Sequence, residues 1–270
     1  MLSVDRLCKC YGDLRALDGV TFEIAHPGLI AVIGRSGAGK STLLRMINRL
    51  DTPTSGAVAF DGTDVLALSG TALRRWRASA AMIFQGFNLA PRLTVLTNVL
   101  VGASVETPPL RRLFGLHHAA DRLRAAGHLD DLDLLDKALV RAERLSGGQQ
   151  QRVAIARALM QRPRLILADE PVASLDPHNA RVVMDTLARI AREARIPVLC
   201  NLHSLELARA YAERAIGLAA GRIVFDGPIA ALTDRAAEAV YDTAHQTNAA
   251  PAHPQGAASA APPRVAAQSG

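Results

Sequence analysis

A glycine-rich turn that ends in lysine and serine runs Gly34-Arg35-Ser36-Gly37-Ala38-Gly39-Lys40-Ser41. The apolar run from Leu29 to Ile33 precedes it and predicts a buried strand. The apolar spacing from Lys40 to Leu50 predicts a helix after it. Strand, turn and helix in this order are typical of a loop whose backbone N–H groups face phosphate oxygens. The sequence therefore predicts an α/β fold with a nucleotide site at this turn.

The same turn indicates how the triphosphate is held. Lys40 is expected to contact the β- and γ-phosphates, and the hydroxyl of Ser41 to ligate Mg²⁺. The helix that follows points its positive end at the phosphates. We expect ATP and Mg²⁺ as cofactors, with ATP bound by Gly34, Arg35, Ser36, Gly37, Ala38, Gly39, Lys40, Ser41 and Thr42.

A second apolar run, Leu165 to Ala168, ends in two acids and predicts a second buried strand. Asp169 stands at the end of this strand, where an acid beside the loop can hold Mg²⁺. Glu170 follows one residue later, nearer the γ-phosphate, and is expected to accept a proton from the attacking water. Together with the turn, this pair predicts hydrolysis of ATP.

Another glycine-rich segment, Leu145 to Gln149, lies between the two halves of this site. It has no lysine, so it cannot hold a triphosphate alone, but it makes chemical sense as a lid over the nucleotide of another copy. Ser146 is a good N-cap for a helix that Pro163 ends. We therefore expect a homodimer whose lid residues are Ser146, Gly147, Gly148 and Gln149.

These marks and their order resemble the ABC-type ATPases, and Leu145 to Gln149 resembles the signature of that family. Tyr11 resembles the aromatic residue that stacks on adenine. Gln85 resembles the glutamine that senses Mg²⁺ and the γ-phosphate and leads into a helical subdomain. Ser174-Leu175-Asp176 resembles the loop that communicates across the dimer, and His203 resembles the switch histidine that contacts the γ-phosphate.

The resemblance extends over about residues 2–240 and implies a P-loop NTPase fold. That fold has a RecA-like core, a small antiparallel β subdomain and a helical subdomain. The resemblance implies that Glu170 and His203 are catalytic, and that Tyr11 and Gln85 join the loop in binding ATP. It also implies a Mg²⁺ site made by Ser41, Gln85 and Asp169.

A finer resemblance is to the ATP-binding subunit of phosphonate importers. It rests on the segments Ile83–Leu89, Arg92–Leu100, Leu145–Leu159 and Glu170–Pro177, and on Arg111–Gly115. Val172-Ala173-Ser174 and Asn201-Leu202-His203 also suggest this branch, because many other relatives carry Thr-x-Ala and Thr-His there. Ser204 and Arg35 depart from the wider class, in which an acid and Pro or Ser are common at these positions.

The finer resemblance implies an ATPase that energises phosphonate import across the bacterial inner membrane. Because the chain has no apolar run of about 20 residues, this role requires a separate transmembrane permease. A periplasmic phosphonate-binding protein would act indirectly, and the chain would lie at the cytoplasmic face as a peripheral protein. Two alternatives stay open: import of phosphate, an amino acid or another small anion or nutrient, and a soluble ABC ATPase acting on DNA or ribosomes.

Composition fits one globular unit. The chain has 270 residues, 49% of them hydrophobic, and a net charge of +6. Its arginines are scattered without interleaved aromatics, so we expect no nucleic-acid partner. The three cysteines, Cys8, Cys10 and Cys200, form neither a zinc-site pattern nor a disulfide framework.

The predicted domain boundaries follow from pattern and composition. Residues 1–246 are expected to form the nucleotide-binding domain, with a helical subdomain at about residues 86–161. Residues 247–270 are rich in Ala and Pro without periodicity, so we expect this tail to be disordered. Within the domain we expect antiparallel strands at 20–24 and 58–60, helices at 94–104, 119–145 and 177–194, and a buried parallel strand at 198–201.

Overall fold

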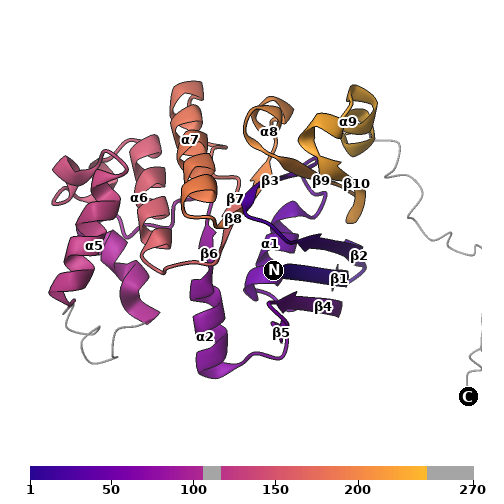
Figure 1. Ribbon diagram of the computed structural model, residues 1–270, viewed down its shortest axis with the longest axis horizontal. Coiled ribbons are helices and arrows are strands. Elements are labelled where there is room, and N and C mark those ends of the chain that lie inside the picture. The colour runs from indigo at the N-terminus through magenta and orange to yellow at the C-terminus, as the bar shows by residue number, and fades with distance from the viewer. Residues whose placement is uncertain (106–116, 242–270) are drawn as a thin grey trace, which may run out of the picture.

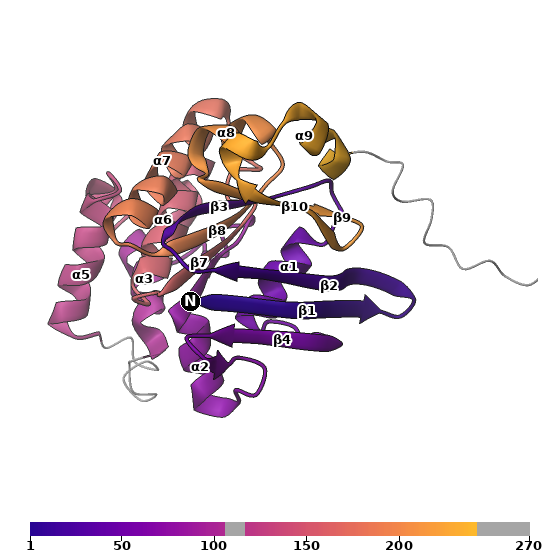
Figure 2. The ribbon, with the colours of Figure 1, turned by 45° about the vertical axis from the view of Figure 1, so that its right-hand side comes forward.

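The computed structural model describes residues 1–105 and 117–241 and contains two β-sheets (Figure 1). The smaller sheet has the order β2-β1-β4-β5 and is antiparallel. Its strands are β1 (Leu2–Tyr11), β2 (Leu14–Ile24), β4 (Ser55–Phe60) and β5 (Thr63–Asp64). This sheet confirms the predicted antiparallel β subdomain. It contains the N-terminal strand β1 (Figure 2).

The larger sheet has the order β10-β9-β3-β8-β7-β6. Its strands are β3 (Gly28–Ile33), β6 (Ala80–Ile83), β7 (Leu165–Asp169), β8 (Pro197–Leu202), β9 (Arg214–Ala219) and β10 (Arg222–Pro228). All neighbours are parallel except β9 and β10. Since parallel strands end at one edge, the residues after β3, β6, β7 and β8 come together there.

Helices cover both faces of the larger sheet, so its strands are apolar on both sides. Helix α1 (Lys40–Asn48) packs between this sheet and the smaller one, in a cluster with Val32 and Leu199. The opposite face, with Ala31 and Cys200, packs against other helices. These include α7 (Pro177–Glu193), α8 (Leu205–Tyr211) and α9 (Asp234–Tyr241), which lie together in Figure 1.

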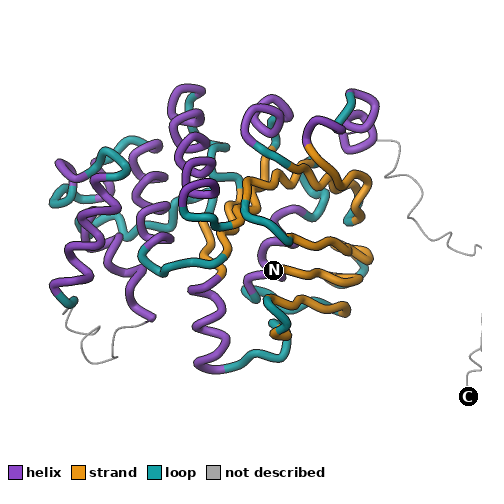
Figure 3. Tube along the Cα trace, viewed as in Figure 1, coloured by secondary structure: helices purple, strands orange, loops and turns teal. Residues whose placement is uncertain are grey.

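The described residues between Gln85 and Gln161 form helices and loops (Figure 3). It contains α3 (Val95–Leu100), α5 (Ala119–Asp130) and α6 (Gly147–Leu159), with short 3₁₀ turns at Val101–Val105, Leu135–Lys137 and Ala142–Arg144. Helix α2 (Gly70–Ser79) precedes β6, and a further 3₁₀ turn, Ile229–Ala231, follows β10. None of the helices in the described ranges combines the length and apolar composition needed to cross a bilayer.

Several expected helices differ at their ends. The helix expected over 119–145 ends at Asp130, because Asp133 has a left-handed φ of 54° and reverses the chain. The helix expected over 40–50 ends at Asn48, since Arg49 takes a left-handed C-cap. The helix expected over 94–104 becomes a 3₁₀ turn after Leu100. The expected tail at 247–270 and the segment Arg111–Gly115 lie outside the described residues.

Candidate functional site: a nucleotide cavity at the carboxyl edge of the sheet

The phosphate loop joins β3 to α1, as predicted, and close backbone approaches require two of its glycines, Gly34 and Gly39. Gly39 has a φ of 103°, and a Cβ there would lie 2.5 Å from the carbonyl oxygen of Ala16. Gly34 has a φ of 149°, and a Cβ would lie 2.3 Å from the carbonyl oxygen of Leu218. Neither position accepts a side chain, so these glycines let the loop pack tightly over the sheet edge.

The loop presents free backbone donors. In the part of the chain that the structure describes, the N–H groups of Gly37, Gly39, Lys40 and Ser41 have no acceptor. Three of them belong to the N-terminal end of α1, where helical N–H groups lack partners and the helix dipole is positive. Such a cluster of donors binds anionic oxygen atoms.

Lys40 supplies a buried cation at the same place. Its side chain is 4% exposed, and Nζ donates to the carbonyl oxygens of Gly34 at 2.8 Å and Arg35 at 2.9 Å. Burial lowers the pKa of Lys40, and the carboxylates of Glu170 and Asp169 oppose this shift. An anionic phosphate would give this desolvated ammonium a stronger partner than two carbonyls.

The strand-end acid lies beside the loop serine. Ser41 Oγ donates to Asp169 Oδ1 at 2.7 Å, although the residues are far apart in sequence. The amide of Asn201 on β8 donates to the same oxygen at 2.7 Å. A hydroxyl beside a carboxylate is the oxygen donor set that Mg²⁺ prefers, so these residues fit the ion. Gln85 lies exposed just after β6, and no hydrogen bond of the described residues joins it to this pair.

Glu170 and His203 contact each other. His203 Nε2 lies 2.5 Å from Glu170 Oε1; Glu170 is 16% exposed, whereas the histidine is 43% exposed. They follow the neighbouring strands β7 and β8, whose ends meet at this edge. Glu170 has a φ of 51°, an uncommon conformation for a non-glycine residue that is found at functional sites.

A cavity of about 930 Å³ opens beside the phosphate loop and Glu170, whereas Asp169 and His203 do not line it. It is lined by Tyr11, by loop and helix residues including Ser36, Gly37 and Gly39 to Thr42, and by Glu170. Its size suits a nucleotide-sized ligand. The structure thus brings Tyr11, residues of the phosphate loop and Glu170 together around one cavity.

Tyr11 is held by charged neighbours that sequence reasoning did not identify. Its hydroxyl donates to Asp51 Oδ2 at 2.6 Å, and Lys9 Nζ donates to Asp51 Oδ1 at 2.9 Å. The same ammonium lies 4.7 Å from the centre of the tyrosine ring. The bonds from Tyr11 and then Lys9 lower the pKa of Asp51 to about 2, and the bond to Asp51 raises the pKa of Tyr11. The Tyr11 residue stays 45% exposed, which leaves its ring accessible for stacking on a ligand base.

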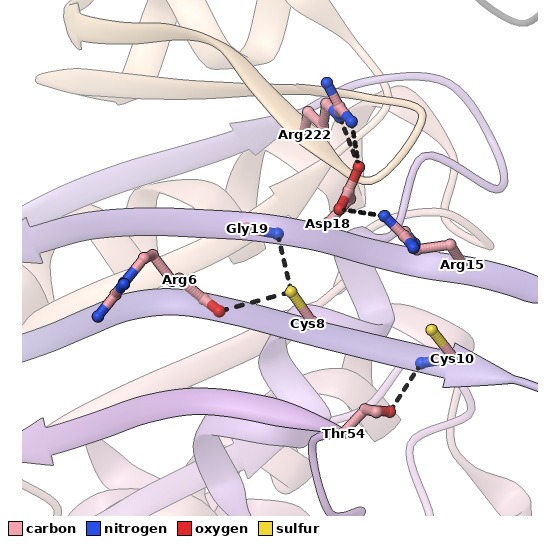
Figure 4. Close-up of polar contacts among 8 residues, drawn as sticks. All are labelled: Arg6, Cys8, Cys10, Arg15, Asp18, Gly19, Thr54 and Arg222. Carbon is pink, nitrogen blue, oxygen red and sulfur yellow. Dashed lines mark hydrogen bonds and ion pairs between the residues drawn. The ribbon is translucent and has the colours of Figure 1, made fainter. Parts of the chain in front are cut away.

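An ion-pair network at the cavity rim was also missed (Figure 4). Arg222 Nε donates to Asp18 Oδ2 at 2.7 Å, and Arg15 Nη1 donates to Asp18 Oδ1 at 2.9 Å. Arg222 and then Arg15 lower the pKa of Asp18. All three residues line the cavity and tie β2 to β10. Arg15 and Asp18 are close in the chain, but Arg222 is far from both, and no sequence motif marks the three residues.

None of the three cysteines lines this cavity. Cys8 Sγ donates to the carbonyl oxygen of Arg6 and accepts from the N–H of Gly19 within the smaller sheet (Figure 4). Cys200 is fully buried, and burial raises its pKa.

The lid segment Ser146 to Gln149 begins α6. Ser146 Oγ accepts from Gln149 N at 3.3 Å, and Gln149 Oε1 accepts from Ser146 N at 3.0 Å, which forms a capping box. Ser146 is exposed, and none of these four residues lines the cavity of the same chain. One protomer therefore presents the loop and the lid at separate places.

The fold and this site define a P-loop nucleotide-binding protein of the ATP-binding cassette class. The profile of the ABC transporter family matches residues 17–173. The chain is 56% identical over 242 residues to phosphonates import ATP-binding protein PhnC 1 of Rhodopseudomonas palustris, covering 90% of each. It is 57% identical to phosphonates import ATP-binding protein PhnC of Bradyrhizobium diazoefficiens, again over 90% of each. The chain belongs to the ABC transporter family, whose members bind ATP.

Solved structures agree. A dimeric ATP-binding cassette, MJ0796, in a post-hydrolysis state with ADP and Pi is similar with a TM-score of 0.75 and 34% identity, over 85% of this chain and 99% of that one. A nucleotide-free cassette from an ABC transporter has a TM-score of 0.75 and 27% identity, over 89% and 94% of the two chains. The predicted family and fold class are confirmed.

Proposed function

We propose that this chain is the ATP-hydrolysing subunit that energises import of phosphonates through a separate membrane permease. The observation that carries the proposal is 56% identity, over 90% of both chains, to a protein named for phosphonate import. The cavity with its loop, buried lysine and strand-end acids supports ATP as the energy source. This role places the chain at the cytoplasmic face of the bacterial inner membrane, as a peripheral subunit.

The residues of one protomer have different proposed roles at the triphosphate. The free N–H groups of the loop and the ammonium of Lys40 bind phosphate oxygens. Ser41 and Asp169 would hold Mg²⁺, and Gln85 is the further ligand that the family resemblance implies; the ion would supply positive charge to neutralise the phosphates. Glu170 accepts the proton of the attacking water, and His203 orients this carboxylate through their contact.

A second copy completes the site. Ser146 to Gln149 do not line their own chain's cavity, and they stand at the exposed N-terminus of α6, whose free N–H groups favour an anion. In the proposed homodimer these residues cap the γ-phosphate held by the partner. Ser174-Leu175-Asp176 lies close to the lid, since a Cβ at Gly147 would be 3.3 Å from Leu175 Cδ2.

The permease is proposed to dock on the helical region that follows Gln85. A periplasmic phosphonate-binding protein would reach this chain only through that permease. Opening and closing of the dimer then moves the permease, because closure needs ATP and is lost after hydrolysis.

ATP turnover of the assembled complex tests the proposed cargo. The chain, its permease and its binding protein are reconstituted in vesicles, and turnover is measured with a phosphonate, phosphate or an amino acid inside the binding protein. We expect stimulation by the phosphonate. Stimulation by phosphate or an amino acid alone would reassign the cargo, and recovery of this chain with ribosomes or DNA instead of a permease would contradict import.

A further inference from the structure

A buried asparagine lies beside the acid assigned to the metal. Asn201 of β8 is paired with Asp169 of β7 in the parallel register and is 0% exposed. Its Nδ2 donates to Asp169 Oδ1 at 2.7 Å. Because a carboxylate only accepts, the amide nitrogen is the end that faces it. The amide thus provides a donor that fixes the direction of this carboxylate.

The other end of the amide has no partner. Oδ1 of Asn201 is buried, and no donor of the described residues reaches it. Apart from Asp169, the neighbours named on the same face of the sheet are apolar: Val32 on β3 lies beside Asn201, and Leu199 stands two residues earlier. A buried acceptor without a donor disfavours folding, and an apolar side chain here would avoid that cost. Stability alone therefore does not explain the asparagine.

We propose that Asn201 is a positioning residue for Mg²⁺. Its amide holds the carboxylate of Asp169 in the orientation that receives the ion. Mg²⁺ usually keeps several waters, and hydrogen bonds to its ligands orient them. Ser41 also bonds Asp169 but is itself assigned to the metal, so Asn201 is the donor with no other role. The inference rests on the proposed function, which assigns Ser41 and Asp169 to Mg²⁺.

The experiment separates metal binding from stability. The dissociation constant of a fluorescent, non-hydrolysable ATP analogue is measured in Mg²⁺ and in EDTA, alongside the urea midpoint of unfolding. For Asn201→Leu we expect the strengthening by Mg²⁺ to fall on the order of 10–100-fold, the usual effect of losing a hydrogen bond to a metal ligand. Binding in EDTA should be unchanged. The urea midpoint should change little, because the variant removes both the unpaired acceptor, which disfavours folding, and the bond to Asp169, which favours it.

Asn98 provides the matched control. It is also buried, at 2% exposed, but its Oδ1 accepts from Ala90 N at 2.8 Å and its Nδ2 donates to Thr94 O at 3.0 Å. Asn98→Leu breaks satisfied bonds far from the metal, so the midpoint should fall while the effect of Mg²⁺ stays as in the wild type. Asn201→Asp, which keeps the shape but replaces the donor with a second negative charge, should lose the effect of Mg²⁺ as well.

The outcomes distinguish the inference from the function. If Mg²⁺ strengthens binding equally in the wild type and Asn201→Leu, Asn201 has no positioning role, whereas the metal assignment stands. A lower midpoint for Asn201→Leu with an unchanged effect of Mg²⁺ would show a purely structural role. If Mg²⁺ has no effect on the wild type, the Mg²⁺ assignment and the inference both fail.

Discussion

At the scale of single residues, Glu170 shows how the site departs from what stability favours. Its left-handed φ of 51° costs about 1–3 kcal/mol for a residue with a side chain. This backbone turns the chain directly after β7 and allows the carboxylate to meet His203 at 2.5 Å. The strain is therefore localised at the residue proposed as the general base, which lines the cavity.

Glu170→Gln should retain ATP binding and lower turnover by about 10²–10⁴, the usual contribution of a positioned general base. Glutamine keeps the size of the side chain but has little basicity, so only proton transfer is removed. Turnover and nucleotide affinity are measured on the same preparation, with the exposed Glu238→Gln on α9 as the control. Near-normal hydrolysis by Glu170→Gln would remove Glu170 from this role.

Asp51 links acid stability to the tyrosine at the nucleotide cavity. Its pKa falls from 3.8 to about 2 in the folded chain, so the folded state favours the carboxylate. The resulting contribution to the free energy of unfolding is complete above about pH 4 and is lost as pH falls toward 2. Since Asp51 is 34% exposed, solvent screening keeps the contribution small.

Asp51→Asn should therefore flatten the loss of stability between about pH 4 and pH 2. Urea midpoints of both proteins across this range provide the measurement. Asp130→Asn, at an exposed position on α5, is the control and should follow the wild-type curve. Parallel curves for Asp51→Asn and the wild type would show that the Tyr11–Asp51–Lys9 contacts add nothing to acid stability.

At the scale of elements, the packing of α6 against α7 depends on a glycine in the lid segment. A Cβ at Gly148 would lie 2.3 Å from Asn179 Oδ1 and 2.8 Å from Asn179 Cβ. Gly148→Ala should lower the free energy of unfolding by about 1–3 kcal/mol, as overpacking usually does.

Gly127→Ala is the matched control, because nothing lies within 4 Å of a Cβ there. Gly127 lies inside α5, so its replacement should raise stability by about 0.5–1 kcal/mol. Equal effects would contradict the packing argument.

The sequence predicted the elements whose signals are local. The phosphate loop, the strand ending in Asp169 and the N-cap at Ser146 each lie within a few residues of their own pattern. The short strand β6 was missed because its four residues, Ala80–Ile83, show neither alternation nor turn residues. It forms by pairing with β7, and only the folded sheet supplies that partner.

The same distinction applies to the site. Lys40, Asp169, Glu170 and His203 stand in motifs, and the structure brings them to one edge. Asp18 and Asp51 stand in no motif, and Asn201 belongs to a segment that the resemblance singled out without assigning it a contact. Their partners Arg222, Tyr11 and Asp169 are set by the folded structure. Their roles follow from geometry that periodicity does not encode.

At the scale of the whole molecule, one protomer supplies only part of each nucleotide site in the dimer proposed above. Its cavity has the loop on one side and an open mouth, while its own lid residues lie elsewhere on the chain. A solved cassette with 34% identity to this chain is a dimer bound to ADP and Pi. If each site is shared in the proposed way, it combines the loop of one chain with the lid of the other. Substitutions in the loop and in the lid of one chain then affect two different sites.

Two inactive variants should therefore restore activity when mixed. Lys40→Ala disables the loop and Ser146→Arg disables the lid, but a mixed dimer joins the intact loop of one chain to the intact lid of the other. With free exchange in an equal mixture, turnover should return to about a quarter of wild type, because half of the dimers are mixed and each has one intact site. Lys40→Ala mixed with Glu170→Gln is the control and should stay inactive, since both residues act in the same half. If Ser146→Arg alone hydrolysed ATP at the wild-type rate, or if both mixtures recovered equally, the lid would not act across the dimer.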